Sequence, residues 1–166
     1  MEPADLIAAW TLVRAPQRVA RAHHLQIVVS DRCNLACAGC LKSDPKHRPT
    51  NRNLPLAQLE RALAHLRPRV VTLLGEGDPL LHPDFAALVR AVTDRGARAL
   101  VATNLSVGDQ GTFEQLLDAG LDGVKVTLSH SDRERYREIK GRDIFEEVTG
   151  RLATLMAVRA ARGGRA

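Results

Sequence analysis

Aromatic residues are scarce in this chain, at 3% of its 166 residues. Single-stranded nucleic acids are commonly held by bases stacking on aromatic side chains. The formal net charge of +5 comes mostly from arginines scattered along amphipathic segments, as on the solvated faces of helices. Few stacking platforms and dispersed positive charge together argue against nucleic acid as a partner.

Long apolar runs are also absent. No stretch approaches the ~20 apolar residues that a membrane-spanning helix needs. The acidic start, residues 1–5, does not have the pattern of a signal peptide. We therefore expect a cytoplasmic protein with no membrane segment, and its length is sufficient for one domain with a proper core.

Cysteine is the third scarce residue, yet all three cysteines fall in one short stretch. Cys33, Cys37 and Cys40 have the spacing C-x₃-C-x₂-C. Three cysteines cannot all pair, and in a reducing compartment thiols stay free. A structural zinc ion usually takes four ligands in two pairs, and here only His47 could complete the set. An iron–sulfur cube for electron transfer uses four thiolates, so three would leave one iron open for other chemistry. The spacing favours a cluster, with zinc or unliganded thiols as the alternatives.

A repeating pattern surrounds the cysteines: a short β-rich run, a loop, then an amphipathic helix. We expect strands at residues 25–29, 70–74, 98–102 and 123–128. We expect helices at residues 55–66, from His82 to Gly96, before Gly120, from Ser131 or Asp132 to Gly141, and over the apolar positions from Ile144 to Met156. This period predicts βαβ units, whose right-handed crossovers place the strands parallel. The predicted fold class is therefore α/β.

The domain plan follows from the same pattern. Residues 1–24 are expected to form an N-terminal helical extension, residues 25–161 the core, and residues 162–166 a loose tail. Two pairs of residues match the capping-box pattern and are expected to start helices: Thr112 with Gln115, and Asp143 with Glu146.

In parallel α/β proteins the loops that follow the strands build the site. The second strand is followed by GEGDPLLHPDF, in which Gly75 and Gly77 allow close approach of backbone and Asp78 adds negative charge. The alternative is an acidic turn without a ligand. Thr103 and Asn104 follow the third strand and either contact a ligand or cap their loop.

The fourth strand presents a polar face. Alternation places Lys125, Thr127 and Ser129 on one side, which would line a site or, on an edge strand, face water.

These segments resemble the motifs of one family. The stretch CNLACAGC after a strand resembles the cysteine motif of the radical SAM (S-adenosylmethionine) superfamily. GEGDP resembles its GGEP motif, with Asp78 in place of Glu and Glu76 in place of a glycine. Thr103-Asn104 resembles its Thr-Asn-Gly turn, with Leu105 in place of the glycine. VKVTLSHSD and YREIKGRDIFEEV also match in order, so the resemblance covers about residues 25–156.

The resemblance implies two cofactors. Cys33, Cys37 and Cys40 would bind a 4Fe–4S cluster whose fourth iron chelates S-adenosylmethionine. Further cofactor-binding residues would be Gly75, Gly77, Asp78, Thr103, Asn104, Thr127 and Ser129. Reductive cleavage would give a 5′-deoxyadenosyl radical that abstracts hydrogen from an unknown substrate, in peptide modification or cofactor biosynthesis. A reductant such as flavodoxin or ferredoxin is the implied partner.

The resemblance also implies a parallel-stranded partial (βα) barrel that is truncated. The family core usually has six βα units, and four are expected here. The chain would be a fragment that lacks a C-terminal half, a short member that pairs with a partner chain or itself, or an inactive copy. The competing function is a non-catalytic module that holds an iron–sulfur cluster or zinc.

Overall fold

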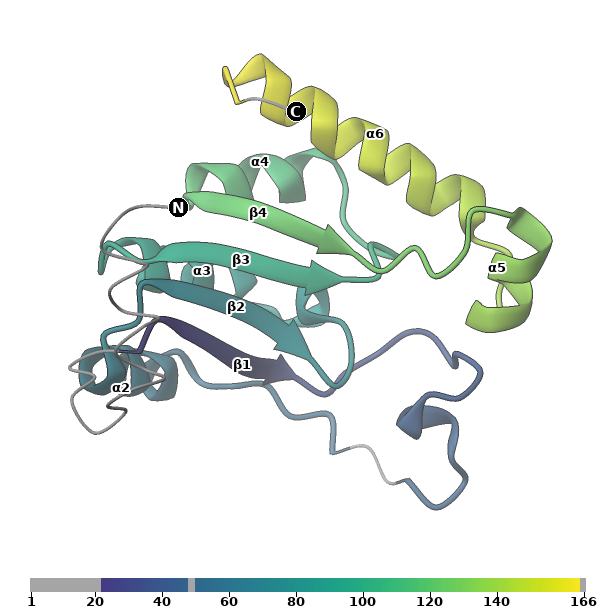
Figure 1. Ribbon diagram of the computed structural model, residues 1–166, viewed down its shortest axis with the longest axis horizontal. Coiled ribbons are helices and arrows are strands. Elements are labelled where there is room, and N and C mark those ends of the chain that lie inside the picture. Colours follow the sequence, from purple (N-terminus) through teal and green to yellow (C-terminus); the bar gives the residue numbers. More distant parts are fainter. Residues whose placement is uncertain (1–21, 48–49, 165–166) are drawn as a thin grey trace, which may run out of the picture.

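The computed structural model describes residues 22–47 and 50–164. Its centre is one parallel sheet in the order β1-β2-β3-β4, so each strand lies beside the next one along the chain (Figure 1). The strands are β1 (His24–Ser30), β2 (Val70–Gly75), β3 (Arg98–Thr103) and β4 (Leu121–Val126). The α/β class and the parallel pairing expected from the sequence are confirmed.

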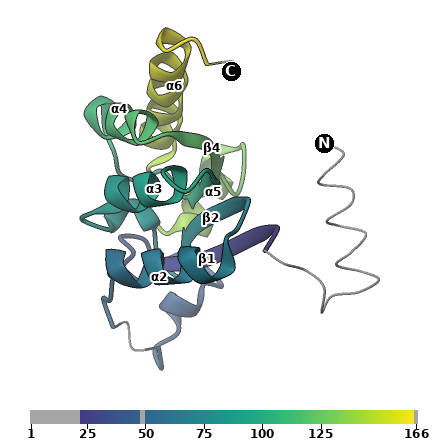
Figure 2. The same ribbon diagram turned by 90° about the vertical axis from the view of Figure 1, so that its left-hand side faces the viewer.

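Five α-helices follow the strands in the described part of the chain. They are α2 (Leu56–Leu66), α3 (Phe85–Thr93), α4 (Gln110–Asp118), α5 (Arg133–Lys140) and α6 (Phe145–Ala161). Figure 2 shows α2, α3 and α4 stacked in one layer along one face of the sheet. Two short 3₁₀ helices, η2 (Leu41–Ser43) and η3 (Pro79–Leu81), lie in the loops after β1 and β2.

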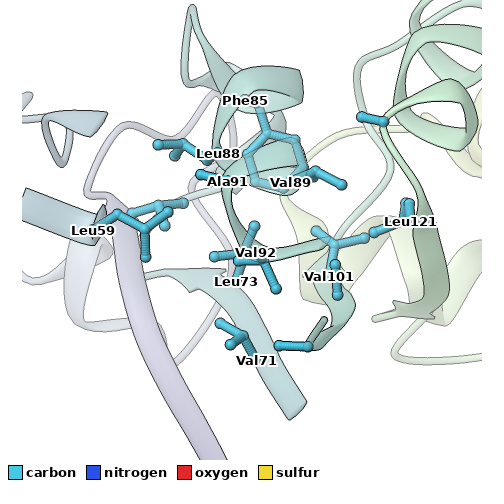
Figure 3. Close-up of a cluster of buried hydrophobic side chains, with 14 of the residues drawn as sticks. Leu59, Val71, Leu73, Phe85, Leu88, Val89, Ala91, Val92, Val101 and Leu121 are labelled. Carbon is cyan, nitrogen blue, oxygen red and sulfur yellow. The ribbon is translucent and has the colours of Figure 1, made fainter. Parts of the chain in front are cut away.

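The main core lies between the sheet and this layer of helices. Alternate residues of the strands, such as Val71, Leu73 and Val101, meet Leu59 of α2 and Leu88 of α3 (Figure 3). All five are buried, and close packing of this kind supplies most of the stability of a small domain. The core therefore fixes the carboxyl ends of β1, β2 and β3 relative to one another.

A second core joins the end of the chain to the cysteine loop. Tyr136 of α5 and Val148 of α6 pack with Leu35 of that loop, and Cys33 and Cys37 lie against the same cluster. The loop is thus anchored by apolar contact with helices far away in the sequence.

The fourth strand is shifted from the predicted residues 123–128. Leu121 already pairs with Ala99, and the strand ends at Val126. Ser129 has a positive φ of 70°, so strand alternation does not continue to that residue. The backbone N–H of Thr127 still bonds to the carbonyl of Thr103, and Thr127 is exposed like Lys125, so the predicted shared strand face is wrong only at Ser129.

Two of the helix starts were also predicted wrongly. The N-cap of α4 is Asp109, whose side chain accepts a hydrogen bond from the backbone N–H of Thr112. The N-cap of α6 is Ile144, without a side-chain hydrogen bond, because Asp143 binds Arg133 instead. In contrast, the helix from Asp132 to Gly141 is confirmed as α5 with those two caps.

The sequence predicts a helical extension at the N-terminus and a loose tail at the C-terminus. Most of the expected N-terminal helical extension, residues 1–21, lies outside the described residues, as do the last two residues of the tail. β1 begins at His24 and α6 ends at Ala161. Within the described residues no helix has the length and apolar character needed to cross a membrane.

Candidate functional site

The three cysteines lie on the loop that joins β1 to η2, at the carboxyl end of the sheet (Figure 1). All three are free thiols and half-buried. The carbonyl of Cys37 accepts hydrogen bonds from the backbone N–H of Cys40 at 3.1 Å and from the hydroxyl of Ser43 at 2.7 Å. These bonds turn the chain back so that the second and third cysteines stay close in a compact turn.

The end of α5 holds this loop from one side. The backbone N–H of Ala38 donates to the carbonyl of Ile139 at 2.7 Å. Gly141 comes so near to the cysteine loop that an added Cβ would lie 3.1 Å from the carbonyl of Ala36. A main-chain bond and a close approach at glycine leave little freedom for the loop to move away from α5.

Asn34 connects the cysteine loop to the loop after β3. Its side-chain oxygen accepts a hydrogen bond from the hydroxyl of Ser106 at 2.8 Å. The backbone N–H of Ser106 in turn donates to the side chain of Asn104 at 2.7 Å. The carbonyl of Asn34 also accepts from the guanidinium of Arg142 at 3.3 Å. Asn34 is thus the point at which three loops meet.

The glycines after β2 bring the next loop against the cysteine loop. A Cβ on Gly75 would lie 2.7 Å from the carbonyl of Ser30, and one on Gly77 would overlap the carbonyl of Arg32. The backbone N–H of Asp78 donates to that same carbonyl of Arg32 at 2.7 Å. The close approach that the structure shows at these glycines is therefore to protein backbone.

Asp78 is 1% exposed, and both of its carboxylate oxygens accept hydrogen bonds. One oxygen accepts from the backbone N–H of Leu80 at 2.9 Å, and the other from the backbone N–H of Asn104 at 2.8 Å. The hydroxyl of Thr103 lies within hydrogen-bond distance of both oxygens, at 3.0 and 2.7 Å. This buried carboxylate ties the loop after β2 to the loop after β3, and Thr103 acts in that link rather than facing an opening.

Neighbouring Glu76 is exposed, in contrast to Asp78. It lines an open cavity of ≈ 510 Å³ at the end of β1, together with Val28, Asp31 and Arg52. The loop after β2 therefore carries one carboxylate directed into the protein and one that solvent can reach.

Thr127 and Ser129 follow β4 and are both exposed. The backbone N–H of Thr127 donates to the carbonyl of Thr103 at 2.9 Å, and its own carbonyl accepts from the ammonium group of Lys140 at 3.1 Å. The backbone of Thr127 is therefore fixed while its hydroxyl stays accessible at the same edge as the cysteine loop.

The electrostatics of the site centre on Cys37. Burial raises the pKa of its thiol, the ammonium of Lys140 opposes that shift, and Cys33 and Cys40 add to it. The three thiols stand on one short loop between β1 and η2. A cluster or metal would bind these cysteines as thiolates, since the thiolate is the ligand form of cysteine.

In residues 22–47 and 50–164, no three His, Cys, Asp or Glu side chains are grouped as the ligands of a single metal ion. A cluster is larger than an ion, and the thiolates around it stand farther apart. Three free thiols on one anchored loop suit a cluster as a donor set, because iron–sulfur clusters are held by cysteine thiolates.

A family model supplies the decisive comparison. The model of the Radical SAM superfamily matches residues 27–158, which is most of the chain and includes every loop described above. The chain belongs to the radical SAM superfamily. Membership brings the two cofactors of that family, a 4Fe–4S cluster and S-adenosylmethionine.

Curated relatives of this radical SAM chain include a GTP 3',8-cyclase of Chlorobaculum tepidum. The two are 36% identical over 136 residues, which is 81% of this chain and 41% of that enzyme. A GTP 3',8-cyclase of Klebsiella pneumoniae is 30% identical over 132 residues, 76% of this chain and 40% of the enzyme. The chain therefore spans about two fifths of the length of these relatives.

Solved structures show the same fold. SuiB of Streptococcus suis, bound to its precursor peptide SuiA, superposes with a TM-score of 0.70 at 20% sequence identity, over 93% of this chain and 35% of SuiB. At this identity the likeness concerns the fold alone. It confirms four βα units of a radical SAM partial barrel.

Sequence reasoning missed the residues that hold the cysteine loop in place. Asn34, Tyr136, Lys140 and Arg142 received no role, although the segment from Tyr136 onward matched the family. One signal was available. Tyr136 is the only tyrosine of the chain, and it stands one helical turn before Lys140 in a helix that is otherwise strongly polar.

Proposed function

We propose that this chain is the cofactor-binding part of a radical SAM enzyme, with Cys33, Cys37 and Cys40 as the ligands of the 4Fe–4S cluster. The observation that carries the proposal is the set of three free, half-buried thiols on one loop, held at the carboxyl end of the sheet by α5. Three thiolates leave the fourth iron without a protein ligand, which is the position that S-adenosylmethionine takes in this family.

When bound, these cofactors supply a one-electron cleavage of S-adenosylmethionine to a 5′-deoxyadenosyl radical, which abstracts hydrogen from the substrate. The protein's part is to position and shield. Gly75, Gly77 and Asp78 set the distance between the cysteine loop and the loop after β2, since their contacts are to Ser30 and Arg32. We assign these three residues to the cofactor site as positioning residues.

The exposed residues of these loops would contact S-adenosylmethionine directly. Thr127 and Ser129 are exposed beside the cysteine loop, so their hydroxyls are free to bind the cofactor's ribose. Thr103 and Asn104 act behind them through Asp78, because Thr103 is buried and its hydroxyl already has partners. Glu76 is the exposed carboxylate of the loop after β2 and suits the cofactor's ammonium group.

The substrate that we propose to test first is a purine nucleotide, GTP. The support is the 36% identity to a GTP 3',8-cyclase. A peptide is the second candidate, because SuiB was solved with a precursor peptide on the same fold. We further propose a reductant such as flavodoxin or ferredoxin as partner, more chain or a partner chain to complete the barrel, and a cytoplasmic location.

The test is formation of 5′-deoxyadenosine from S-adenosylmethionine by the full chain after anaerobic cluster reconstitution and chemical reduction, followed by chromatography. Parent protein is expected to give the product, and Cys33→Ala, Cys37→Ala and Cys40→Ala are each expected to give none. Adding GTP or a candidate peptide should accelerate it only for the true substrate. Product that persists in all three cysteine variants would contradict the proposed cluster ligands.

A further inference from the structure

Tyr136 carries a buried hydroxyl that has no hydrogen-bond partner among the described residues. The residue is fully buried, and its ring packs edge-on against Phe145, with ring centroids 5.4 Å apart and an angle of 72° between the planes. A hydroxyl taken out of water without a partner destabilises a fold, so buried hydroxyls nearly always have one. The packing of the ring explains why an aromatic residue is here, but leaves the hydroxyl unexplained.

Lys140 is a second buried polar group, and it lacks the carboxylate partner that a buried ammonium group usually has. It is 3% exposed, and its ammonium group lies 5.7 Å from the centroid of the Tyr136 ring, one helical turn away. It donates to the carbonyl of Thr127 at 3.1 Å. Within the described part of the chain no carboxylate forms an ion pair with it. A buried cation without an anion is costly, which points to an anionic ligand.

The cysteine loop packs against the part of α5 that carries both groups. Cys33 and Cys37 pack against the apolar cluster that contains Tyr136. The α5 backbone is bonded to the cysteine loop through Ile139, which directly precedes Lys140.

We propose that Tyr136 and Lys140 set the reduction potential of the cluster from the side of Cys37, an inference that rests on the proposed cysteine ligands. A 4Fe–4S core of charge 2+ with three thiolates carries a net charge of −1. One electron from an external one-electron donor makes it −2, and no bond forms or breaks. With the cluster bound, the Tyr136 hydroxyl would donate a hydrogen bond to a sulfur on the side of Cys37, and the Lys140 ammonium would offset the added negative charge.

Both groups stabilise the more negative, reduced state. Hydrogen bonds to sulfur and nearby charge are among the factors that set cluster potentials. Each therefore raises the potential and makes the electron easier to accept. Tyr136 and Lys140 would in this way belong to the cluster site, although neither is a ligand.

The experiment uses the full chain, reconstituted with iron and sulfide, in a redox titration followed by electron paramagnetic resonance. Tyr136→Phe keeps the ring and removes only the hydroxyl, and Lys140→Met keeps the chain length and removes the charge. Each is expected to make reduction about tenfold less favourable at a given potential, which is 59 mV for a one-electron couple. Lys46→Met is the matched control, because it removes the same charge from an exposed position beyond η2.

The supporting result is a lower midpoint potential in Tyr136→Phe and Lys140→Met, with the iron content of the parent and no shift in Lys46→Met. Unchanged potentials in both variants at full iron content would overturn the inference while the cysteine ligands stand. Loss of iron from the parent itself would instead remove the proposed function and the inference with it.

Two further measurements separate tuning from other roles. Unfolding of the cluster-free protein should be no easier in Tyr136→Phe than in the parent, because the hydroxyl has no partner there. A clear loss of stability would show a structural partner and overturn the inference. If Lys140→Met weakened only the binding of S-adenosylmethionine and left the potential of the cofactor-free cluster unchanged, Lys140 would be a cofactor ligand, and the inference would fail for it.

Discussion

The two sides of the cysteine loop differ in how completely the protein satisfies its own polar groups. On the side of β2, Asp78 is buried and both of its oxygens accept hydrogen bonds from Leu80, Thr103 and Asn104. On the side of α5, the buried hydroxyl of Tyr136 has no partner among the described residues. The Asp78 carboxylate is thus satisfied by the protein alone, whereas the Tyr136 hydroxyl is not.

The difference indicates a structural role for one side and a functional role for the other. A buried carboxylate with three donors locks the loops after β2 and β3 together, whatever is bound. Unpartnered groups cost stability in the free protein, and such costs are characteristic of functional sites. Substitutions on the side of β2 should therefore lower the stability of the protein. Substitutions on the side of α5 should instead change the properties of the bound cofactor.

Asp78→Ala should show the largest effect on stability. It leaves the donors of Leu80, Thr103 and Asn104 buried without an acceptor, at about 1–3 kcal/mol each. We expect the free energy of unfolding, measured in urea, to fall by roughly 3 kcal/mol or more. Glu76→Ala is the control, since its exposed carboxylate should change stability by less than about 0.5 kcal/mol. Equal effects in the two variants would contradict the structural role of Asp78.

Gly77→Ala should come next. Its Cβ would overlap the carbonyl of Arg32, so the loop after β2 must move away from the cysteine loop. We expect a loss of about 1–3 kcal/mol in unfolding free energy and a lower iron content after reconstitution. Gly39→Ala provides the comparison, because nothing lies within 4 Å of its Cβ and only its positive φ of 72° opposes the change, at about 1–2 kcal/mol. The iron content should stay at the parent level in Gly39→Ala and fall in Gly77→Ala.

Thr127→Ala should leave stability nearly unchanged and weaken cofactor binding. Thr127 is exposed at the same edge of the sheet as the cysteine loop, and losing one hydrogen bond to the cofactor costs about 1.4 kcal/mol, a tenfold rise in Kd. Binding of S-adenosylmethionine to the reconstituted protein can be followed by calorimetry. Ser131→Ala, also exposed but farther along the chain, is the control. Parent affinity in Thr127→Ala would exclude its hydroxyl from the cofactor site.

The smallest effect is expected at the ion pair of Asp143 and Arg133, which joins the start of α5 to the start of α6. The hydrogen bond from Arg133 lowers the pKa of Asp143 below its usual range. A lowered carboxylate pKa contributes stability above the unfolded-state pKa of about 3.9 and loses it as the pH falls through the folded-state value. Asp143→Asn should thus be slightly less stable than the parent at neutral pH, and the difference in urea midpoint should vanish in acid below that range.

Much of the fold could be predicted from the sequence, because local patterns fix it. β2, which ends at Gly75, and β3, which ends at Thr103, coincide with apolar runs in the sequence. The inward positions of α3, such as Leu88 and Val92, are buried as their helical spacing predicts. The end of β4 could not be predicted in this way. The alternation of VKVTLS continues past Val126, but the backbone turns at Ser129.

The site was harder to predict, because its contacts join residues far apart in the sequence. GEGDP shows a turn with two carboxylates, yet only the fold reveals that Asp78 is the buried one, since its partner Thr103 is 25 residues away. The helix starts failed for a different reason, which is competition from a nearby residue. Asp109 reaches the Thr112 N–H first, and Arg133, ten residues before Asp143, competes for that carboxylate.

The most direct test is electron paramagnetic resonance on the anaerobically reconstituted, reduced full chain, with and without S-adenosylmethionine. The account predicts a 4Fe–4S signal that depends on Cys33, Cys37 and Cys40 and changes when the cofactor is added, because the cofactor binds the iron that lacks a protein ligand. A cluster signal that does not respond to the cofactor would contradict this account and favour a non-catalytic metal-binding module.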